Sequence, residues 1–171
     1  MEVNLHIYSG IGNLIAIVDG IRNDLHISSK EVDHVYNFHG VNFDQLIILL
    51  PPSDPQNDLD VKIFNNDGSI ASNCINGARC VGRFIKDNSL LASNKFKVKT
   101  DGGLWELDNV ENNIFSAAFE VKAEIITKKV EAKGIELSLD CINLGNLHGV
   151  TFENKQIDMR FLAIGESLQR N

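Results

Sequence analysis

The sequence predicts an α+β fold, because short strand-like segments dominate its first half and helical patterns interrupt them. Strands are expected where apolar and polar residues alternate, or where a short apolar run ends at turn residues. These segments are 3–7, 14–18, 46–50, 59–63, 96–98 and 104–107. The run Asp101-Gly102-Gly103 supplies the turn of a hairpin between the last two segments.

Three helical patterns lie among the strands. Ser28 with Glu31 three residues later fits a capping box, which predicts a helix after residue 28. A second helix should begin near residues 76–77 and end near residue 88. Its apolar stripe consists of Val81, Phe84 and Ile85. A weaker pattern predicts a third helix over 158–168.

A domain boundary is predicted near residue 119, where the strand pattern pauses before it restarts at 121–127 and 135–142. The two predicted domains are 1–119 and 120–171. The second has roughly fifty residues, which is marginal for an independent hydrophobic core. We therefore expect the second domain to be incomplete.

Composition excludes several classes of function. Hydrophobic residues make up 43% of the 171 residues, so a packed core is expected. The net charge of −7 disfavours nucleic acid as a partner. No basic run or long apolar run indicates a membrane, and the N-terminus does not resemble a signal peptide, so we expect a cytoplasmic protein. The three cysteines should be free thiols, and no ligand spacing indicates a metal.

The strongest functional candidate is Cys74, which follows a turn and precedes the second predicted helix. The N–H groups and dipole of a helix start stabilise a thiolate, and they also bind carboxylates. A thiol in this position suits proton exchange at the α-carbon of a small amino acid. The alternative is a small buried hydrophobic side chain, which is the commoner role of a lone cysteine. The dense polar residues of 65–76 favour the reactive thiol.

The segment Phe64–Ser69, followed by Asn73–Cys80, closely resembles the signature of the diaminopimelate epimerase family. Three further segments resemble motifs of that family in the same order: Ser9–Asn13, Asn42–Gln45 and Leu144–His148. Ordered matches are far more specific than any single motif. The resemblance covers nearly the whole chain, but only the first part of a family member.

The resemblance implies a fold of two similar domains, each with a curved, barrel-like mixed sheet around a central helix, and an active site in the cleft between them. It implies conversion of LL-diaminopimelate to the meso form, in lysine and peptidoglycan precursor synthesis, without pyridoxal phosphate or another cofactor. Two cysteines exchange the proton, and Cys74 matches the first of them. His148 matches a residue beside the active site. The matching substrate contacts are Asn13, Gln45, Asn65, the backbone at Ile75 and Asn76, and Asn146.

Departures from the family pattern leave other functions open. The family's second catalytic cysteine and a Glu-Arg pair belong to a later segment, so this chain alone is not expected to exchange the α-proton. Ile75 stands where glycine is usual, and it would crowd the substrate or prevent a positive φ. One alternative is a non-catalytic domain that binds a small amino acid or a partner protein and completes its core by forming a homo-oligomer. Another is an isomerase of the same fold that acts on a different small acid.

Overall fold

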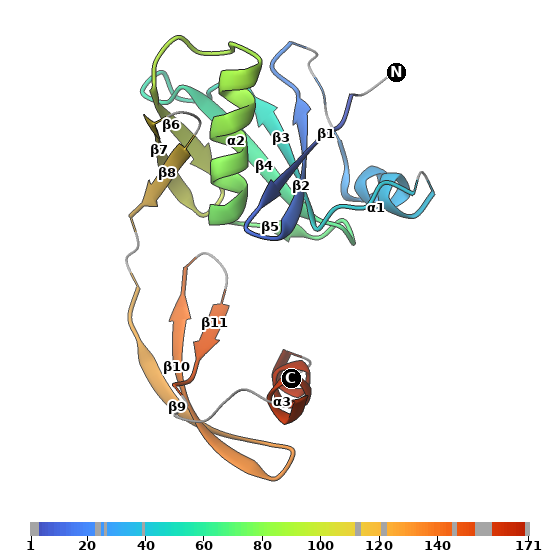
Figure 1. Ribbon diagram of the computed structural model, residues 1–171, viewed down its shortest axis with the longest axis vertical. Helices are drawn as coiled ribbons and strands as arrows, with labels where there is room; N and C mark the ends of the chain where they lie inside the picture. The colour runs from blue at the N-terminus through green and yellow to red at the C-terminus, as the bar shows by residue number, and fades with distance from the viewer. Residues whose placement is uncertain are drawn as a thin grey trace. The chain divides into compact units, whose positions relative to one another are not determined.

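A computed structural model describes residues 4–22, 25, 27–38, 40–111, 114–120, 123–144, 147–152 and 159–169. The chain divides into two compact units, Met1–Glu120 and Val121–Asn171. Each unit is described separately below, with the element labels of Figure 1.

The described part of the first unit is mostly strands, with helices α1 and α2 between groups of them. Its elements are β1 (His6–Gly10), β2 (Asn13–Asp19), α1 (Ser29–Phe38), β3 (Gln45–Leu50), β4 (Leu59–Asn65), β5 (Ile70–Ala71), α2 (Ile75–Asp87), β6 (Lys95–Thr100), β7 (Gly103–Glu111) and β8 (Ile114–Phe119).

One curved sheet surrounds helix α2 in this unit. The strand order is β1-β2-β3-β4-β6-β7-β8, and β5 pairs with β4. The sheet is mixed, because β2–β3 and β4–β6 are parallel whereas the other pairs are antiparallel. Helix α2 contacts β1 and β2 at one end of the sheet and β7 and β8 at the other, so the sheet curls around it (Figure 1). The predicted α+β fold with a curved mixed sheet around a central helix is confirmed.

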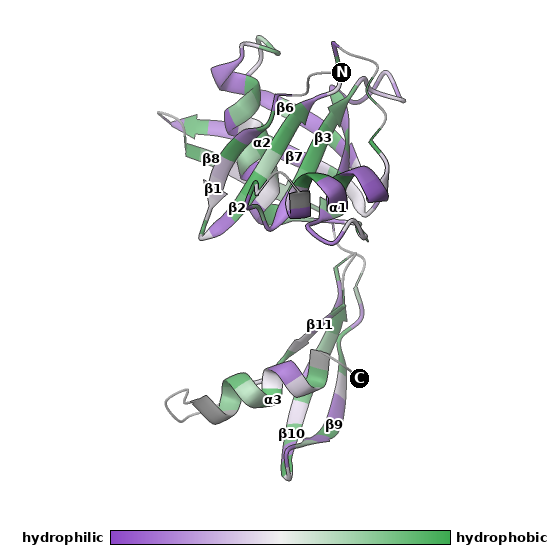
Figure 2. Cartoon of the chain, turned by 90° about the vertical axis from the view of Figure 1, so that its right-hand side faces the viewer, coloured by the Kyte–Doolittle hydropathy of each residue, from purple (hydrophilic) through white to green (hydrophobic). Residues whose placement is uncertain are grey.

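The sheet is buried on both faces at β2 and β3, which explains their nearly continuous apolar sequences. Figure 2 shows β3 as a largely hydrophobic strand. Ile15 and Ile47 face α2, and they join a core that contains the predicted stripe of Val81, Phe84 and Ile85. Ala16 and Ile48 point to the opposite face and pack with Val32 of α1. The two faces therefore support two separate cores within one unit.

The first strand differs from its prediction. The alternation over 3–7 puts Leu5 and Ile7 on the buried face. Leu5 does pack against the core beside α1, but β1 begins only at His6, and Ile7 is 45% exposed. Tyr8 instead packs against the core, where its ring meets Phe84 of α2 edge to face. Aromatic side chains reach the helix from this edge strand, and their packing overrides the weak alternation signal. Residue 3 lies outside the described residues.

The second unit is a small antiparallel sheet with one helix. Its elements are β9 (Ile126–Ala132), β10 (Ile135–Asn143), β11 (Leu147–Val150) and α3 (Met159–Gln169), and the strand order is β11-β10-β9. Its buried hydrophobic side chains are Ala132, Leu137 and Ile164, with Val130 and Leu168 packed against them. This core is small, as the short length of the segment suggests.

Strand β9 begins at Ile126, so among the described residues it overlaps only the end of the strand predicted at 121–127; residues 121 and 122 lie outside the described residues. The position of β9 follows from the tight turn at Lys133 and Gly134, where both residues have positive φ values of 53° and 74°. Such a two-residue turn pairs Ala132 directly with Ile135, and the strand then extends back from the turn. Within the described part of the chain, no helix is long and apolar enough to cross a membrane.

Candidate active site

Strand direction brings three of the predicted substrate contacts to one edge of the sheet. Strands β2 and β3 are parallel, and they begin at Asn13 and Gln45. Strand β4 is antiparallel to β3 and ends at Asn65, which lies directly opposite Gln45 in the register. Starts of parallel strands and the end of an antiparallel neighbour meet at the same edge. The three amide side chains therefore gather although they are far apart in the sequence.

Cys74 caps helix α2. Its backbone is extended, with φ of −153° and ψ of 100°, and its carbonyl accepts the first helical hydrogen bond from the N–H of Ala78 at 2.9 Å. Its sulfur accepts a hydrogen bond from the N–H of Gly77 at 3.2 Å. The thiol thus takes the place that a serine or aspartate oxygen usually occupies at a helix start. The helix begins at Ile75, slightly before the predicted start at 76–77.

The start of α2 lies close against β3. A Cβ added at Gly77 would be 2.5 Å from Cδ1 of Ile47 and 3.2 Å from the sulfur of Cys74. Both distances are shorter than ordinary van der Waals contact. A side chain at position 77 would therefore separate the thiol from the sheet, and glycine is required here for close approach rather than for an unusual φ.

Asn73 helps to fix the loop that precedes Cys74. It is a buried polar residue with 6% exposure, and its Oδ1 accepts a hydrogen bond from the indole N–H of Trp105 at 2.7 Å. The neighbouring carbonyl of Ser72 accepts from the N–H of Gly102 at 2.8 Å. These two bonds anchor the loop before Cys74 to the β6–β7 hairpin. Asn73 therefore has a structural role.

Gln45 and Asn65 form a hydrogen-bonded pair. The Nε2 of Gln45 donates to the Oδ1 of Asn65 at 3.0 Å. The Nδ2 of Asn65 donates to the Oγ of Ser69 at 2.9 Å, and this hydroxyl donates to Asp67 at 2.6 Å. Asp67 can only accept, so it fixes the direction of the whole series. Polar turn residues after β4 thus orient the two predicted substrate contacts.

A second series joins α2 to β2. The Nδ2 of Asn76 donates to the Oδ1 of Asn13 at 2.9 Å. The Nδ2 of Asn13 lies 3.5 Å from Oδ2 of Asp44, and Nη1 of Arg79 lies 3.5 Å from the Oδ1 of Asn76. Sequence reasoning did not single out Asp44 or Arg79. Both lie within the segments that resemble family motifs, which was the available signal.

The protonation of Cys74 departs from its prediction. Burial raises the pKa of the Cys74 thiol above its ordinary value. The N–H groups of Gly77 and Asn76 act in the predicted direction and lower this pKa, but their effect is smaller than that of burial. The prediction considered the helix start alone and left out the apolar wall, since Cys74 packs against the core between α2 and the sheet.

Ile75 does not adopt the backbone conformation that glycine would allow. Among the described residues, the non-glycine positions with positive φ are Ile11, Ser89 and Lys133. Ile75 is the first residue of α2, and its partly buried side chain packs against the core. The predicted conflict over positive φ is therefore absent, and its side chain remains a candidate for shaping substrate choice.

The remaining two predicted site residues belong to the second unit or lie outside the described residues. His148 is an exposed residue of β11, opposite Ile142 of β10. Asn146 is not among the described residues. Within the described parts of the chain, no group of three or more histidine, cysteine, aspartate or glutamate side chains could hold a metal ion.

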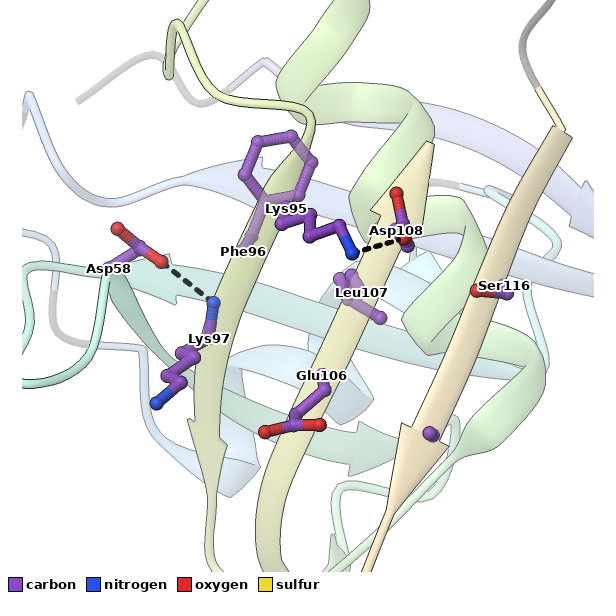
Figure 3. A pocket seen from close by; sticks show the side chains of 9 residues that line it. Asp58, Lys95, Phe96, Lys97, Glu106, Leu107, Asp108 and Ser116 are labelled. Carbon is purple, nitrogen blue, oxygen red and sulfur yellow. Dashed lines mark hydrogen bonds and ion pairs between the residues drawn. The ribbon is translucent and has the colours of Figure 1, made fainter. Parts of the chain in front are cut away.

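Two hollows lie in the first unit, and Cys74 lines neither of them. One, of about 430 Å³, lies on β6, β7 and β8 (Figure 3). There Lys95 pairs with Asp108 at 3.1 Å, and Asp58 accepts a hydrogen bond from the N–H of Lys97 at 2.7 Å. The other, of about 510 Å³, lies between β1, α2 and β8. The first hollow lies on a sheet face, and one ion pair, between Lys95 and Asp108, crosses it.

The family model of diaminopimelate epimerase matches residues 5–120 of this chain. The chain belongs to the diaminopimelate epimerase family. It is 34% identical over 154 residues to the diaminopimelate epimerase of Stutzerimonas stutzeri, and this match covers 82% of the chain and 56% of the relative. The enzyme of Pseudomonas fluorescens is 32% identical over 154 residues, with the same coverage. The chain thus spans about half the length of the curated relatives that it matches.

Solved structures share the fold at low sequence identity. A hydroxyproline epimerase from Agrobacterium vitis, with trans-4-hydroxy-L-proline bound, has a TM-score of 0.62 and 13% identity, and the match covers 99% of this chain and 60% of that one. Methylitaconate-delta-isomerase has a TM-score of 0.55 and 14% identity, with coverage of 98% and 60%. A phenazine biosynthesis protein of the PhzF family from Bacillus anthracis has a TM-score of 0.57 and 16% identity, with coverage of 86% and 53%. At these identities the likeness concerns the fold alone.

Proposed function

We propose that this protein takes part in the epimerisation of LL- to meso-diaminopimelate without a cofactor, with Cys74 as one of two proton carriers. The observation that carries the proposal is the position of its thiol at the start of α2, beside the edge where Asn13, Gln45 and Asn65 meet. Membership of the diaminopimelate epimerase family supports the substrate and the reaction. The expected setting is cytoplasmic synthesis of lysine and of the peptidoglycan precursor.

Helix α2 supplies the chemistry that such a thiol needs. The N–H groups at its start would bind the α-carboxylate of the amino acid. The thiolate of Cys74 would take the α-proton and become a thiol, and the electron pair would remain on the α-carbon. A second acid would then deliver a proton to the opposite face, which inverts the centre. In the reverse direction the two groups exchange roles.

Binding of diaminopimelate is the first test. Titration calorimetry on the 171-residue protein should give a measurable dissociation constant. Gln45→Ala should weaken binding by roughly tenfold, the effect of one lost hydrogen bond to a charged ligand. Cys74→Ser should bind about as well as the wild type, because its hydroxyl can still cap α2. Absence of binding by the wild-type protein at millimolar ligand would overturn the proposal.

Exchange of the α-proton is the second test. Proton NMR in heavy water follows the loss of the α-proton signal of diaminopimelate. The resemblance assigns the second carrier to a later segment of the family's sequence, so we expect slow exchange by these 171 residues alone. Rapid exchange that disappears in Cys74→Ala would show that both carriers lie within these residues.

Ile75 favours a second candidate, an isomerase of the same fold that acts on another small acid. Its bulk beside Cys74 would select against a long substrate. The same calorimeter can compare diaminopimelate with trans-4-hydroxy-L-proline and with methylitaconate. Tighter binding of either compound than of diaminopimelate would favour this second function. Weak binding of all three, together with self-association in sedimentation experiments, would favour a non-catalytic domain.

A further inference from the structure

Four polar side chains form a continuous series at the start of α2, in the order Asp44, Asn13, Asn76 and Arg79. The central distance, between the two amides, is 2.9 Å. Each outer distance is 3.5 Å. Three separate segments contribute: the start of β2, the residue before β3, and the first turn and a half of α2.

We propose that Asp44 and Arg79 are positioning residues, which hold the amides of Asn13 and Asn76 in one orientation toward a bound carboxylate. This inference rests on the proposed function, because it assumes that an amino acid binds at this edge. It adds two residues that the resemblance does not assign.

The chemistry of the two ends determines the direction of the series. A carboxylate can only accept hydrogen bonds, so Asp44 turns the NH₂ group of Asn13 toward itself. The Oδ1 of Asn13 then faces Asn76 and accepts its Nδ2, which leaves the Oδ1 of Asn76 for the guanidinium of Arg79. A guanidinium can only donate. Both ends therefore favour the same direction. A flip of either amide would place oxygen against oxygen on one side and N–H against N–H on the other.

Asp44 is itself held firmly. Its Oδ2 accepts the backbone N–H of Leu14 at 2.8 Å, and its own N–H donates to the carbonyl of Leu14 at 2.8 Å. Its carbonyl accepts from the N–H of Asn66 at 3.2 Å. The preceding residue, Phe43, is fully buried. The carboxylate is thus anchored between β2 and the turn after β4, so it can orient Asn13 without moving.

The orientation decides what a ligand meets. In this direction each amide nitrogen carries a second N–H beyond the one used in the series, and such donors suit a carboxylate. If both amides were reversed, their oxygens would stand where these N–H groups are, and the oxygens would repel the carboxylate. Asp44 and Arg79 therefore act on affinity through Asn13 and Asn76, without touching the ligand.

The first experiment needs no ligand. Side-chain amide signals of Asn13 and Asn76 are assigned in ¹H–¹⁵N spectra by their loss in Asn13→Ala and Asn76→Ala. Asp44→Asn and Arg79→Met should each shift both pairs of signals, because a change at one end passes along the series. The control variants are Asp54→Asn, whose carboxylate also accepts one backbone N–H, and Arg83→Met on the same helix. Neither control should shift these signals.

The second experiment measures affinity for diaminopimelate by calorimetry. Oδ2 of Asp44 accepts both the N–H of Leu14 and the Nδ2 of Asn13, so Asp44→Asn keeps an acceptor for both and removes only the charge; it should retain the fold and weaken binding roughly two- to threefold. In the Asn13→Ala background the same substitution should have little further effect, which identifies action through Asn13. Asp44→Asn serves as the main variant because Asp44→Ala also removes the bond to Leu14.

The outcomes separate the two proposals. Unshifted amide signals in Asp44→Asn and Arg79→Met would overturn the inference. So would a loss of affinity on Asp44→Asn that is as large in the Asn13→Ala background as in the wild type. Wild-type protein that shows the shifts but binds no diaminopimelate would overturn the proposed function and leave the orientation of the amides established.

Discussion

Cys74 combines two opposing influences on one sulfur atom. The N–H groups of Gly77 and Asn76 favour the thiolate, whereas the apolar wall of the core favours the neutral thiol, and burial has the larger effect. The free protein therefore favours the neutral thiol at this position more than an exposed cysteine would. A carboxylate bound at the helix start would bring further negative charge nearby, which also favours the neutral thiol.

The reactivity of Cys74 should reflect its raised pKa. In a Cys141→Ser background, the rate of alkylation by iodoacetamide should keep rising above pH 9, because only the thiolate reacts. Mass spectrometry distinguishes Cys74 from the more deeply buried Cys80, which should react more slowly at every pH. A rate at Cys74 that levels off below pH 8 would contradict the assigned effect of burial.

The thiol of Cys80 should make the free energy of unfolding depend on pH. Burial, then the nearby Cys74, raises the pKa of its thiol from 9.0 to about 11. The folded state therefore favours the neutral thiol more than the unfolded state does. This contribution is complete below pH 9 and is lost as the pH rises through about 11. Urea denaturation measures the free energy of unfolding of the wild type and of Cys80→Ala. The difference between the two proteins should shrink between pH 8.5 and 11, because the raised pKa stabilises only the neutral thiol. A constant difference would contradict it.

Motifs identify the site residues, but they do not supply the geometry that joins them. Asn13, Gln45 and Asn65 are identified by resemblance to family motifs. Their meeting follows from strand direction, which local patterns do not encode. The roles of Asp44 and Arg79 became visible only with the hydrogen bonds to Asn13 and Asn76. Residue types were thus predictable, and the links between them were not.

At the scale of elements, α2 is the best-predicted part of the chain, since its apolar stripe and its end at Asn88 follow from local sequence, although its cap at Cys74 and its start at Ile75 did not. Strand β1 is the poorest, because its buried face depends on Phe84 of a distant helix. Strand β9 depends on the turn at Lys133 and Gly134. The turn that places β9 is a local signal, whereas the edge strand β1 takes its buried face from a distant neighbour.

The close contact between α2 and β3 yields a test at this scale. Gly77→Ala should lower the free energy of unfolding by about 1–3 kcal/mol, because the new methyl group overlaps Cδ1 of Ile47. Ile47→Val removes that carbon. In the Ile47→Val background, Gly77→Ala should therefore lower the free energy of unfolding much less than it does in the wild type. Urea denaturation of the four proteins measures the coupling. Equal costs of Gly77→Ala in both backgrounds would show that the contact with Ile47 is not the cause.

At the scale of the whole molecule, the two units differ in how much core they contain. The first has two cores, one on each face of its sheet, with fully buried residues such as Phe43 and Trp105. The second has a small core around Leu137 and Ile164, and many of its other apolar side chains are exposed. The division at Glu120 falls next to the predicted boundary at 119, where the strand pattern restarts. The completeness of the second domain stays a prediction.

This difference in core size should make proteolysis sequential. Burial of apolar surface contributes about 25 cal/mol per Å², so the first unit should resist local opening far better than the second. Limited trypsin digestion should first cut within 121–171, where Lys128 and Lys129 are exposed on β9, and leave a resistant fragment that contains 1–120. Leu137→Ala should accelerate the early cuts by removing a central core side chain, without changing the lifetime of the resistant fragment. Cleavage of both units at one common rate, equally accelerated by Leu137→Ala, would instead mean that they unfold as a single cooperative structure.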